Sequence, residues 1–526
     1  MGRAADEDVL PHDLARDGKR KVVLAEMQDR RACSPCDVGT IVHGEQRAMP
    51  LCRFREHLEQ PQLVARLEPL LAQLHDVDPA GEDHIEKLRK VARPRARVGT
   101  EIEPGVSEHR PSVGLVPHGS SPQGGLRGQQ PTVEPDPGNS GVRERMTEQH
   151  SDIAIIGAGT IGAAVAWRCA QRGLTVTLAD PDSTRGAWHT AAGMLAPITE
   201  LHYTEEPLLR LGLASLERFP AFAAELEDDT GLPVGLEARG TVAVAWDSAD
   251  LAGLQDLAAF ARQLGVDVEL LTGRELRTLE PALAAGMPGA LHAPGEQQVD
   301  PRLLHAALLE ACRRSGVTIV RSAASVFVED DRATGLTVAD ARHLADHVVL
   351  TAGAWSAQIE GVPPALLPPV RPVKGQTLRL RLTGAPRLSR VVRAEIKGSH
   401  VYLVPRSGGQ IVVGASTEEA GYDTAPRAGA VYELLRDAQT VLPELSEAVL
   451  DEVSTGLRPG TPDNAPIIGT SALDGLIIAS GHYRNGILLT PITADAIAEY
   501  VTTGEVPDVV TPFSPARFAG ARAVRT

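Results

Sequence analysis

The chain has 526 residues, of which 43% are hydrophobic and 23% charged, and this composition is typical of a soluble globular protein with two or three domains. Its net charge of -16 argues against nucleic acid as the main partner, because binding phosphates requires clustered positive charge. The sequence has no run of about 18 uncharged apolar residues and no secretory-signal pattern, and it has only five cysteines, so we expect no membrane span, no disulfide framework and a cytoplasmic location.

The first 145 residues differ in composition from the rest. They contain one aromatic residue, Phe54, and are rich in Arg, Pro, Gly and Gln. Such a segment buries too little apolar surface to offset its ordering entropy, so we expect residues 1–145 to be disordered or not independently folded. Met146 stands just before the first predicted strand, and our hypothesis is that it is the natural start of the protein. Tryptic peptides from upstream of Met146 in the native protein would contradict this.

A CxxC pair, Cys33 and Cys36, lies in the same segment. It is either half of a zinc site, completed by Cys52 or His43, or a chance pair in an unstructured stretch. We predict no metal site elsewhere.

A dinucleotide-binding unit follows. Ile153–Ile156 is a continuous apolar run, as in a strand covered on both faces. Gly157, Gly159 and Gly162 then stand in GxGxxG spacing. The first glycine permits the tight turn, the second lets the backbone approach a pyrophosphate, and the third lets the helix pack closely on the strand.

A helix over Ala163–Ala170 and a second strand over Thr175–Ala179 complete this unit. Asp180 ends the second strand, about 20 residues after the glycines, where an acid bonds a ribose diol. The pyrophosphate is expected at the helix N-terminus, whose free N–H groups and partial positive charge stabilise an anion.

Three later segments favour FAD over NAD, since the fingerprint alone does not distinguish them. Gly186–Leu195 is a second loop of small residues, and Val348–Trp355 is a buried strand running into a glycine turn. Leu476–Gly481 is a further strand, and His482–Leu488 is expected to open a helix that continues through Tyr500.

Four stretches alternate apolar with polar or small residues and predict an antiparallel sheet inserted between these segments: Gly240–Trp246, Gly375–Arg381, His400–Pro405 and Gln410–Ala415. An active site is expected between that sheet and the cofactor, because ligand sites often lie at domain boundaries.

The sequence resembles the D-amino acid oxidase-like family of FAD enzymes, most closely the glycine oxidases of thiamine biosynthesis, over about residues 150–515. The motifs that carry the resemblance are GAGTIG, TAAGML, TAGAWS, VKGQ, VYLVPR, GLRPGTPDNAPIIG and GHYRNGILL. It implies FAD with its adenine end on the fingerprint and its flavin end near Ala192–Met194 and His482–Leu488. The cofactor-binding residues predicted in this way are Gly157, Gly159, Thr160, Ile161, Gly162, Asp180, Ala192, Gly193, Met194, Val326, Gly353, His482, Tyr483, Arg484, Asn485, Gly486, Ile487 and Leu488.

The resemblance also bears on how the flavin is attached. Some sarcosine-oxidase relatives attach it through a cysteine in the C-terminal half, and this chain has no cysteine after Cys312. Non-covalent FAD is therefore expected.

The predicted fold is α/β: a Rossmann-type FAD-binding domain with an inserted antiparallel-sheet substrate domain. Residues 150–232, 298–370 and 455–515 are assigned to the FAD-binding domain, and residues 233–297 and 371–454 to the substrate-binding domain.

Four residues are predicted to act on the substrate. Arg458 matches the family's carboxylate-binding arginine, and a planar guanidinium suits a carboxylate because it makes two parallel bonds. Arg484 matches a second arginine near the substrate, and its alternative is a flavin-side contact. Tyr402 matches a pocket tyrosine, and His400 stands two residues before it, with a structural role as the alternative. Thr417 replaces a bulkier apolar residue, which leaves the pocket size open.

The resemblance implies oxidation of glycine, or of a small amine or D-amino acid, by hydride transfer to the flavin. The products are an imine or 2-oxo acid, ammonia and H2O2, and the imine of glycine would supply the thiazole of thiamine. One alternative is a D-amino acid or sarcosine-type dehydrogenase that passes electrons to a carrier. Another is a catalytically silent FAD-binding assembly subunit. The expected partners are a small amino acid and O2, with a homotetramer implied by the resemblance.

Overall fold

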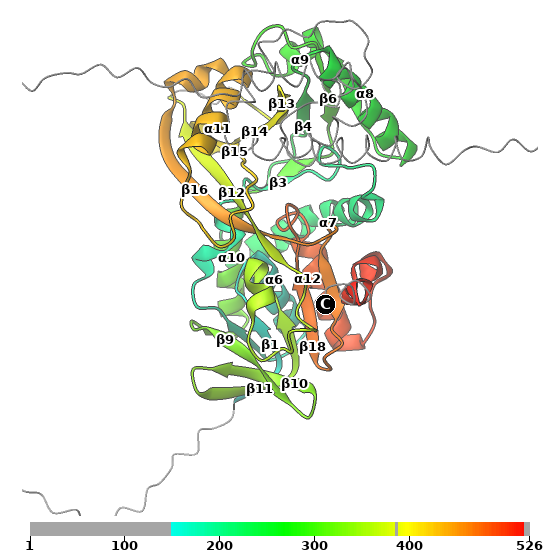
Figure 1. Cartoon of the computed structure of the whole chain (residues 1–526), viewed down its shortest axis with the longest axis vertical. Coiled ribbons are helices and arrows are strands. Elements are labelled where there is room, and N and C mark those ends of the chain that lie inside the picture. Colours follow the sequence, from blue (N-terminus) through cyan, green and yellow to red (C-terminus); the bar gives the residue numbers. More distant parts are fainter. Residues whose placement is uncertain (1–148, 384–387, 520–526) are drawn as a thin grey trace, which may run out of the picture. The chain divides into compact units, whose positions relative to one another are not determined.

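The computed structural model describes residues 149–383 and 388–519, and all that follows concerns those residues (Figure 1). The predictions for residues 1–145, for the Cys33 and Cys36 pair and for Met146 lie outside the described residues. The described part contains two eight-stranded sheets and one two-stranded sheet. The predicted α/β class, with a Rossmann-type sheet and a second sheet inserted into it, is confirmed.

The first sheet has a parallel centre, as expected of a dinucleotide-binding fold. Strand β1 pairs in parallel with both β11 and β2, β2 pairs with β8, and β11 pairs with β18. Antiparallel pairs join β10 to β11 and β9, and β17 to β18. The strands are β1 (Gln149–Ile156), β2 (Val176–Ala179), β8 (Thr318–Val320), β9 (Ala324–Glu329), β10 (Arg332–Val338), β11 (Ala341–Leu350), β17 (Ile467–Thr470) and β18 (Leu476–Ser480).

Helix α6 (Thr160–Gln171) is the centre of the helical layer on this sheet. It contacts β1 and β2, and it packs against α10 (Pro301–Arg314) and α12 (Thr490–Thr503), which also contact α7 (Glu206–Thr230). Its alanines at 163, 164 and 166 are fully buried, so their small side chains let the helix lie close to the strands. The helix that follows the fingerprint glycines is thus part of the hydrophobic core.

The helix predicted to open at residues 482–488 begins later. The chain between Ser480 and Leu489 forms turns, with bonds from Asn485 N to His482 O of 2.9 Å and from Leu489 N to Asn485 O of 2.8 Å. Helix α12 starts at Thr490, directly before Pro491. Proline is favoured in the first turn of a helix because its missing N–H would have no partner there. The turns therefore lie before the helix rather than in it.

The second sheet is mainly antiparallel, with one exception. Strands β13 and β4 pair in parallel, which is possible because a long stretch of chain connects them. In spatial order the strands are β16 (Val449–Gly460), β12 (Arg371–Arg381), β15 (Gln410–Gly414), β14 (Ser399–Pro405), β13 (Val391–Ile396), β4 (Thr241–Val244), β6 (Gly289–Ala293) and β5 (Glu269–Thr272).

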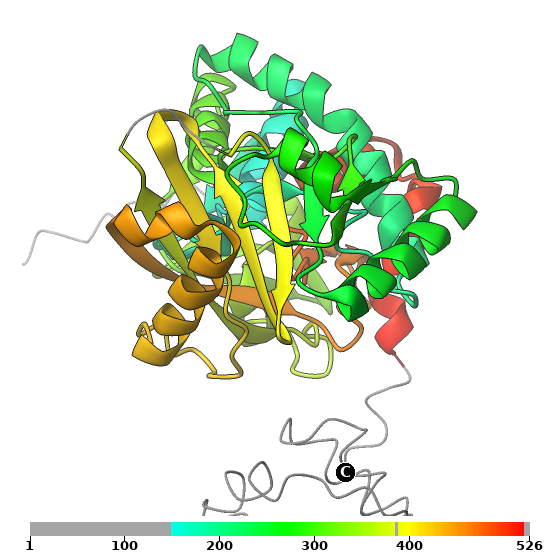
Figure 2. The ribbon, with the colours of Figure 1, turned by 90° about the horizontal axis from the view of Figure 1, so that it is seen from above.

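Three helices accompany the second sheet. Helix α11 (Ala428–Val441) packs across β12, β14 and β15, as Figure 2 shows, and α8 (Ser248–Gln263) and α9 (Gly273–Leu279) pack on β5 and β6. Strand β16 pairs with β12 without a break through residue 455, where a domain boundary was predicted. The domain boundaries themselves stay predictions.

Arg406 joins the second sheet to the loop that precedes the two-stranded sheet of β3 (Met194–Leu195) and β7 (Gln297–Gln298). Its guanidinium donates to Gln298 Oε1 at 2.9 Å, to Val299 O at 2.9 Å and to Ala192 O. Burial lowers the pKa of Arg406 to about 10, which still leaves it charged at neutral pH. A buried cation thus fixes the backbone of this loop.

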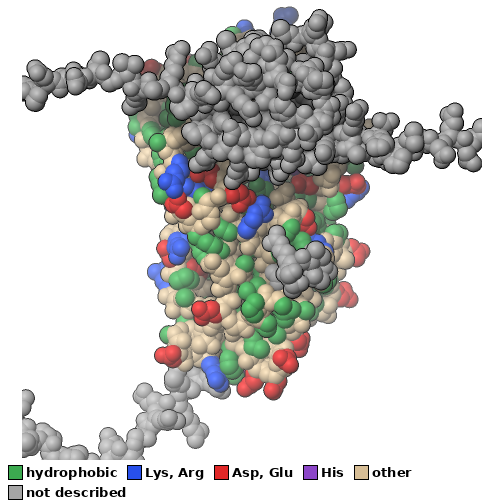
Figure 3. Space-filling model, viewed as in Figure 1, with side chains coloured by type: hydrophobic (Ala, Val, Ile, Leu, Met, Phe, Trp, Pro, Cys, Tyr) green, Lys and Arg blue, Asp and Glu red, His purple; other side chains and the backbone are tan. Residues whose placement is uncertain are grey.

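The surface carries both signs of charge. Figure 3 shows Lys and Arg side chains interspersed with Asp and Glu over the coloured part of one face. None of the helices in the described residues is long and apolar enough to cross a membrane.

We predict that Arg406→Met lowers the free energy of unfolding by about 3 kcal/mol, because it leaves buried carbonyl groups without their donor. The control is Arg381→Met, which removes an exposed ion pair to Asp451 and should cost less than about 1 kcal/mol. Chemical denaturation followed by fluorescence measures both. Equal losses in the two variants would contradict the role given to Arg406.

Candidate functional site

A cavity of about 630 Å³ lies where the first sheet, the second sheet and the loops between them meet. Its walls include the fingerprint turn, the end of β2, the loop of residues 185–194, the turn after β11, parts of β12, β14 and β16, and the turns after β18. Most of the predicted site residues come from these segments.

The three fingerprint glycines have separate geometric roles. Gly157 has a φ of +108°, and a Cβ there would lie 2.6 Å from Thr351 O. A Cβ at Gly162 would lie 1.8 Å from Gly157 O, so α6 can approach the turn only because that side chain is missing. A Cβ at Gly159 would meet nothing closer than Trp188, at 3.9 Å, and Gly159 lines the cavity. Gly159 is therefore the glycine that leaves space for a ligand.

Asp180 is held rigidly at the cavity end of β2. Its Oδ2 accepts from Ala158 N at 2.7 Å, and its Oδ1 accepts from Asp182 N at 2.8 Å. Burial raises the pKa of Asp180, while the two backbone hydrogen bonds act to lower it. Each carboxylate oxygen retains acceptor capacity for a hydroxyl group such as those of a ribose.

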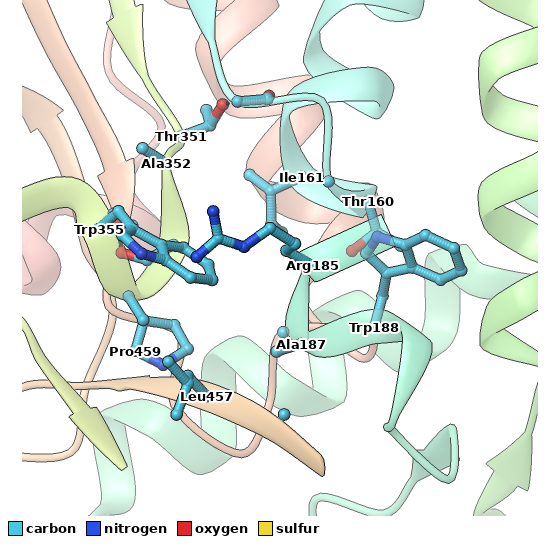
Figure 4. A pocket seen from close by; sticks show the side chains of 18 of the residues that line it. Thr160, Ile161, Arg185, Ala187, Trp188, Thr351, Ala352, Trp355, Leu457 and Pro459 are labelled. Carbon is cyan, nitrogen blue, oxygen red and sulfur yellow. Dashed lines mark hydrogen bonds between the residues drawn. The ribbon is translucent and has the colours of Figure 1, made fainter. Parts of the chain in front are cut away.

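Four aromatic or basic residues near the fingerprint turn and Asp180 were not among the predicted site residues. Arg185 lies 5.0 Å from the centre of the Trp355 ring and points toward it across the cavity (Figure 4). Trp188 stacks on His305 with ring centroids 3.7 Å apart. Burial lowers the pKa of His305 to about 4, so the neutral ring donates through Nε2 to Ala158 O at 2.7 Å. The stacked rings of Trp188 and His305 are thus fixed to the fingerprint turn.

The loop of small residues approaches the chain after β7 very closely. Gly193 has a φ of +75°, and a Cβ there would lie 2.0 Å from Val299 O. Val299 N donates to Gly193 O at 2.9 Å. Together with Arg406, these contacts hold the backbone of Ala192–Met194 against the cavity.

The turns after β18 form the opposite wall. Tyr483 N donates to Pro459 O at 3.0 Å, which joins these turns to β16. His482 is buried, and its Nε2 is hydrogen-bonded to Thr493 Oγ1 at 3.1 Å. Burial lowers the pKa of His482 to about 3, so it stays neutral.

Arg458 and Tyr402 reach the cavity from the second sheet. Arg458 Nη1 donates to Ser416 O at 3.0 Å. Burial raises the pKa of Tyr402, and its hydroxyl therefore stays protonated; the nearby positive charge of Arg458 acts in the opposite direction. Glycines face both side chains: a Cβ at Gly375 would lie 2.3 Å from Arg458 Nη1, and one at Gly414 would lie 2.3 Å from Tyr402 Oη.

Glu200 and Arg393 form an ion pair beside this group, and neither was predicted. Glu200 lines the cavity together with Arg458 and Arg484. Burial raises the pKa of Glu200, but the charges of Arg393, Arg484 and Arg458 outweigh it, so the pKa is lowered overall. Arg484 Nη2 lies 2.9 Å from His202 Nε2. This end of the cavity is therefore lined by two arginines and one ionised carboxylate, and Arg393 lies beside them.

Most predicted site residues line the cavity. On the substrate side these are Arg458, Arg484 and Tyr402. On the cofactor side they are Gly157, Gly159, Thr160, Ile161, Asp180, Ala192, Gly193, Met194, Gly353, His482, Tyr483, Gly486 and Ile487. Gly162 packs beneath the turn instead, and Asn485 and Leu488 line a smaller neighbouring cavity.

His400, which was predicted to act on the substrate, does not line the cavity. It lies at the start of β14, beside the β13–β14 hairpin turn, where its side chain is 79% exposed and paired with Glu395 at 3.7 Å. It is not among the residues that line the cavity. Because side chains alternate along a strand, His400 and Tyr402 point to the same face of the sheet. They are two residues apart, however, or about 7 Å along the strand, and His400 therefore lies beyond the edge of the cavity.

Val326, predicted to bind the cofactor, and Thr417, whose size left the pocket size open, do not line the cavity either. Val326 is buried in the core, and its N–H donates to Glu360 O at 2.9 Å; its neighbours Ala324 and Ser325 line the cavity in its place. Thr417 is exposed and does not line the cavity, so its small side chain does not enlarge the pocket.

The chain is similar to known proteins over most of the described residues. The family model described as FAD dependent oxidoreductase (DAO) matches residues 152–500. A glycine oxidase from Geobacillus kaustophilus is 36% identical over 386 residues, which cover 71% of this chain and 99% of that protein. The crystal structure of glycine oxidase from Geobacillus kaustophilus superposes with a TM-score of 0.66 at 34% identity and covers 70% of this chain and 99% of that one.

A bifunctional protein ThiO/ThiG from Synechocystis sp. is 33% identical over 373 residues. The match covers 70% of this chain and 54% of that protein, so this chain spans about half of it.

The residues around the cavity fit FAD. Gly159 leaves room for a pyrophosphate at the N-terminus of α6, where none of the first-turn residues is acidic, and Asp180 offers carboxylate oxygens to a ribose. Of the cysteines in the described residues, Cys169 and Cys312 are buried in the core and neither lines the cavity, which agrees with non-covalent binding.

We predict that Gly159→Ala weakens FAD binding by about 2 kcal/mol, roughly 30-fold in Kd, because its methyl group enters the space that the cofactor needs. The flavin-free protein should keep its melting temperature, since nothing else occupies that space. Gly162→Ala is the matched contrast, and it should lower the melting temperature of the flavin-free protein. FAD titration and thermal unfolding measure the two effects, and unchanged FAD affinity in Gly159→Ala would refute the assignment.

Proposed function

The chain belongs to the family of FAD-dependent oxidoreductases, and from that premise we propose that it oxidises glycine, or a small amine or D-amino acid, at the end of the cavity lined by Arg458, Tyr402 and Arg484. The observation that carries the proposal is that this arginine-rich end and the cofactor fingerprint line one continuous cavity. With O2 and water, the amine yields an imine and then a 2-oxo acid, ammonia and H2O2.

FAD, when bound, supplies the hydride acceptor for this oxidation. Arg458 is assigned to the substrate carboxylate. Its bond to Ser416 O fixes the guanidinium, which has further N–H donors for a ligand. A bidentate contact would orient the substrate so that Cα, rather than the carboxylate, faces the cofactor.

The charges of the site favour an anionic group on the substrate. Glu200 balances Arg393, and Arg458 and Arg484 leave an excess of positive charge. A carboxylate is therefore attracted, and a substrate with a basic side chain is disfavoured. Tyr402, which stays protonated, has a hydroxyl able to donate to the same carboxylate.

We further propose that the imine of glycine supplies the thiazole of thiamine. The resemblance to glycine oxidases of thiamine biosynthesis and the match to part of a bifunctional ThiO/ThiG protein support this. The cytoplasmic location and the homotetramer stay predictions.

Two other functions would use the same cavity. A D-amino acid or sarcosine-type dehydrogenase would bind the same carboxylate but pass electrons to a carrier. A silent FAD-binding assembly subunit would not need the arginines at this end, and the presence of Arg458 and Arg484 argues against it.

We predict that Arg458→Ala costs about 3 kcal/mol in kcat/KM, roughly 100-fold, through loss of a charge-assisted bidentate contact. Arg239→Ala, at an exposed arginine, is the control and should change kcat/KM by less than about twofold. Steady-state kinetics with glycine measures both. A loss below about threefold in Arg458→Ala would remove this residue from the carboxylate role.

We predict that the yellow purified protein forms peroxide with glycine. Sarcosine and D-alanine are tested alongside it to define the substrate range. Flavin bleaching without peroxide would instead indicate the dehydrogenase. An absence of bleaching with all three amines would indicate the silent subunit.

A further inference from the structure

The VKGQ motif, residues 373–376, lies beside Arg458. Its one charged residue, Lys374, does not line the cavity. In the pairing of β12 with β16, Val373 lies opposite Arg458 and Gly375 lies opposite Gly456. The space beside Gly375 is filled by the Arg458 guanidinium: a Cβ there would lie 2.3 Å from Nη1 and 2.6 Å from Cζ. The φ of Gly375 is not in the left-handed region, so its missing side chain, and not its backbone freedom, is what matters.

Ser416 fixes the same guanidinium through a hydrogen bond. Its carbonyl accepts from Arg458 Nη1 at 3.0 Å. Ser416 is in turn tied to Gln376 by two bonds, from Gln376 N to Ser416 Oγ at 2.9 Å and from Ser416 N to Gln376 O at 3.3 Å. The orientation of Arg458 thus depends on the chain that follows β15.

Glu418 locks that chain to β12. Its Oε1 accepts from Ser416 Oγ and from Gln376 Nε2, each at 2.6 Å, and its Oε2 lies 3.5 Å from Lys374 Nζ. Lys374 is completely buried and also donates to Ala425 O at 2.6 Å. Burial raises the pKa of Glu418, but its hydrogen bonds and the charge of Lys374 outweigh this and lower the pKa overall, so the carboxylate is ionised.

Burying a lysine is costly, and its ion pair with the partly exposed Glu418 is a poor source of stability compared with apolar residues. A hydrogen-bonded network does, however, specify one geometry. Here that geometry is the place of the Ser416 carbonyl and hence of the Arg458 guanidinium.

We propose that Lys374, Gly375, Gln376 and Glu418 form a positioning element for Arg458, which rests on the proposed role of Arg458 in binding the substrate carboxylate. Gly375 leaves the space for the guanidinium, and the other three side chains hold the carbonyl that orients it. None of the four needs to touch the substrate. Their effect appears in how well the carboxylate is bound and aligned.

The first test is Gly375→Ala in the FAD-loaded protein. The methyl group displaces the guanidinium, so KM for glycine should rise about 10-fold while kcat changes less than about threefold. In the Arg458→Ala background the same substitution should change kcat/KM by less than about twofold, because the displaced group is already missing. If the losses in kcat/KM from the two single substitutions multiply in the double variant, the proposal is overturned, since Gly375 then acts independently of Arg458.

The second test remains informative even where Gly375→Ala does not fold. Glu418→Gln keeps the shape of the side chain and removes its charge, and KM should rise about fivefold, again only when Arg458 is present. The control is its neighbour Glu419→Gln, which is exposed and bonded to Arg371, and KM should change by less than about twofold. Matching effects at 418 and 419 would overturn the proposal.

The role of Arg458 and the role of the positioning element are tested by different outcomes. If Arg458→Ala alone changes kcat/KM less than threefold, the proposed function of Arg458 is wrong. If Arg458→Ala has its full effect but the variants at 375 and 418 behave like the control, the positioning element is wrong and the function stands.

Discussion

The cavity depends on side chains that are missing. Gly159 leaves space for a ligand beside the start of α6, Gly375 leaves space for the Arg458 guanidinium, and Gly414 leaves space for the Tyr402 ring. At each position even a methyl group would enter space needed by the cofactor, or space already occupied by a side chain of the substrate end. The shape of the site therefore depends on the positions of these glycines as much as on its charged side chains.

The two sheets are joined where the chemistry is proposed to occur. Strand β16 runs the length of β12 and ends beside the turns after β18, so Arg458 is carried from the second sheet to the edge of the first. Arg406 crosses in the other direction and holds the loop of Ala192 through its carbonyl. Cofactor and substrate walls are thus fixed to one another by backbone pairing and one buried cation.

Local patterns in the sequence predicted much of this, and long-range contacts account for what they missed. The fingerprint turn and both sheets follow from motifs whose spacing is local, whereas Arg458 and Tyr402 were assigned to the substrate end from the family resemblance. Glu200 and Arg393 pair across a separation of nearly two hundred residues, and no local pattern marks them. His400 was misplaced because alternation gives the side of a strand but not where along the strand the cavity ends.

The most direct test of the account is a crystal structure of the FAD-loaded protein with acetate, a carboxylate that carries no amine. Both acetate oxygens should lie within hydrogen-bond distance of the Arg458 guanidinium, with Nη1 still bonded to Ser416 O and the flavin ring in the same cavity. Acetate bound away from Arg458, or a flavin ring outside this cavity, would contradict the claim that one cavity holds the cofactor and the carboxylate clamp together.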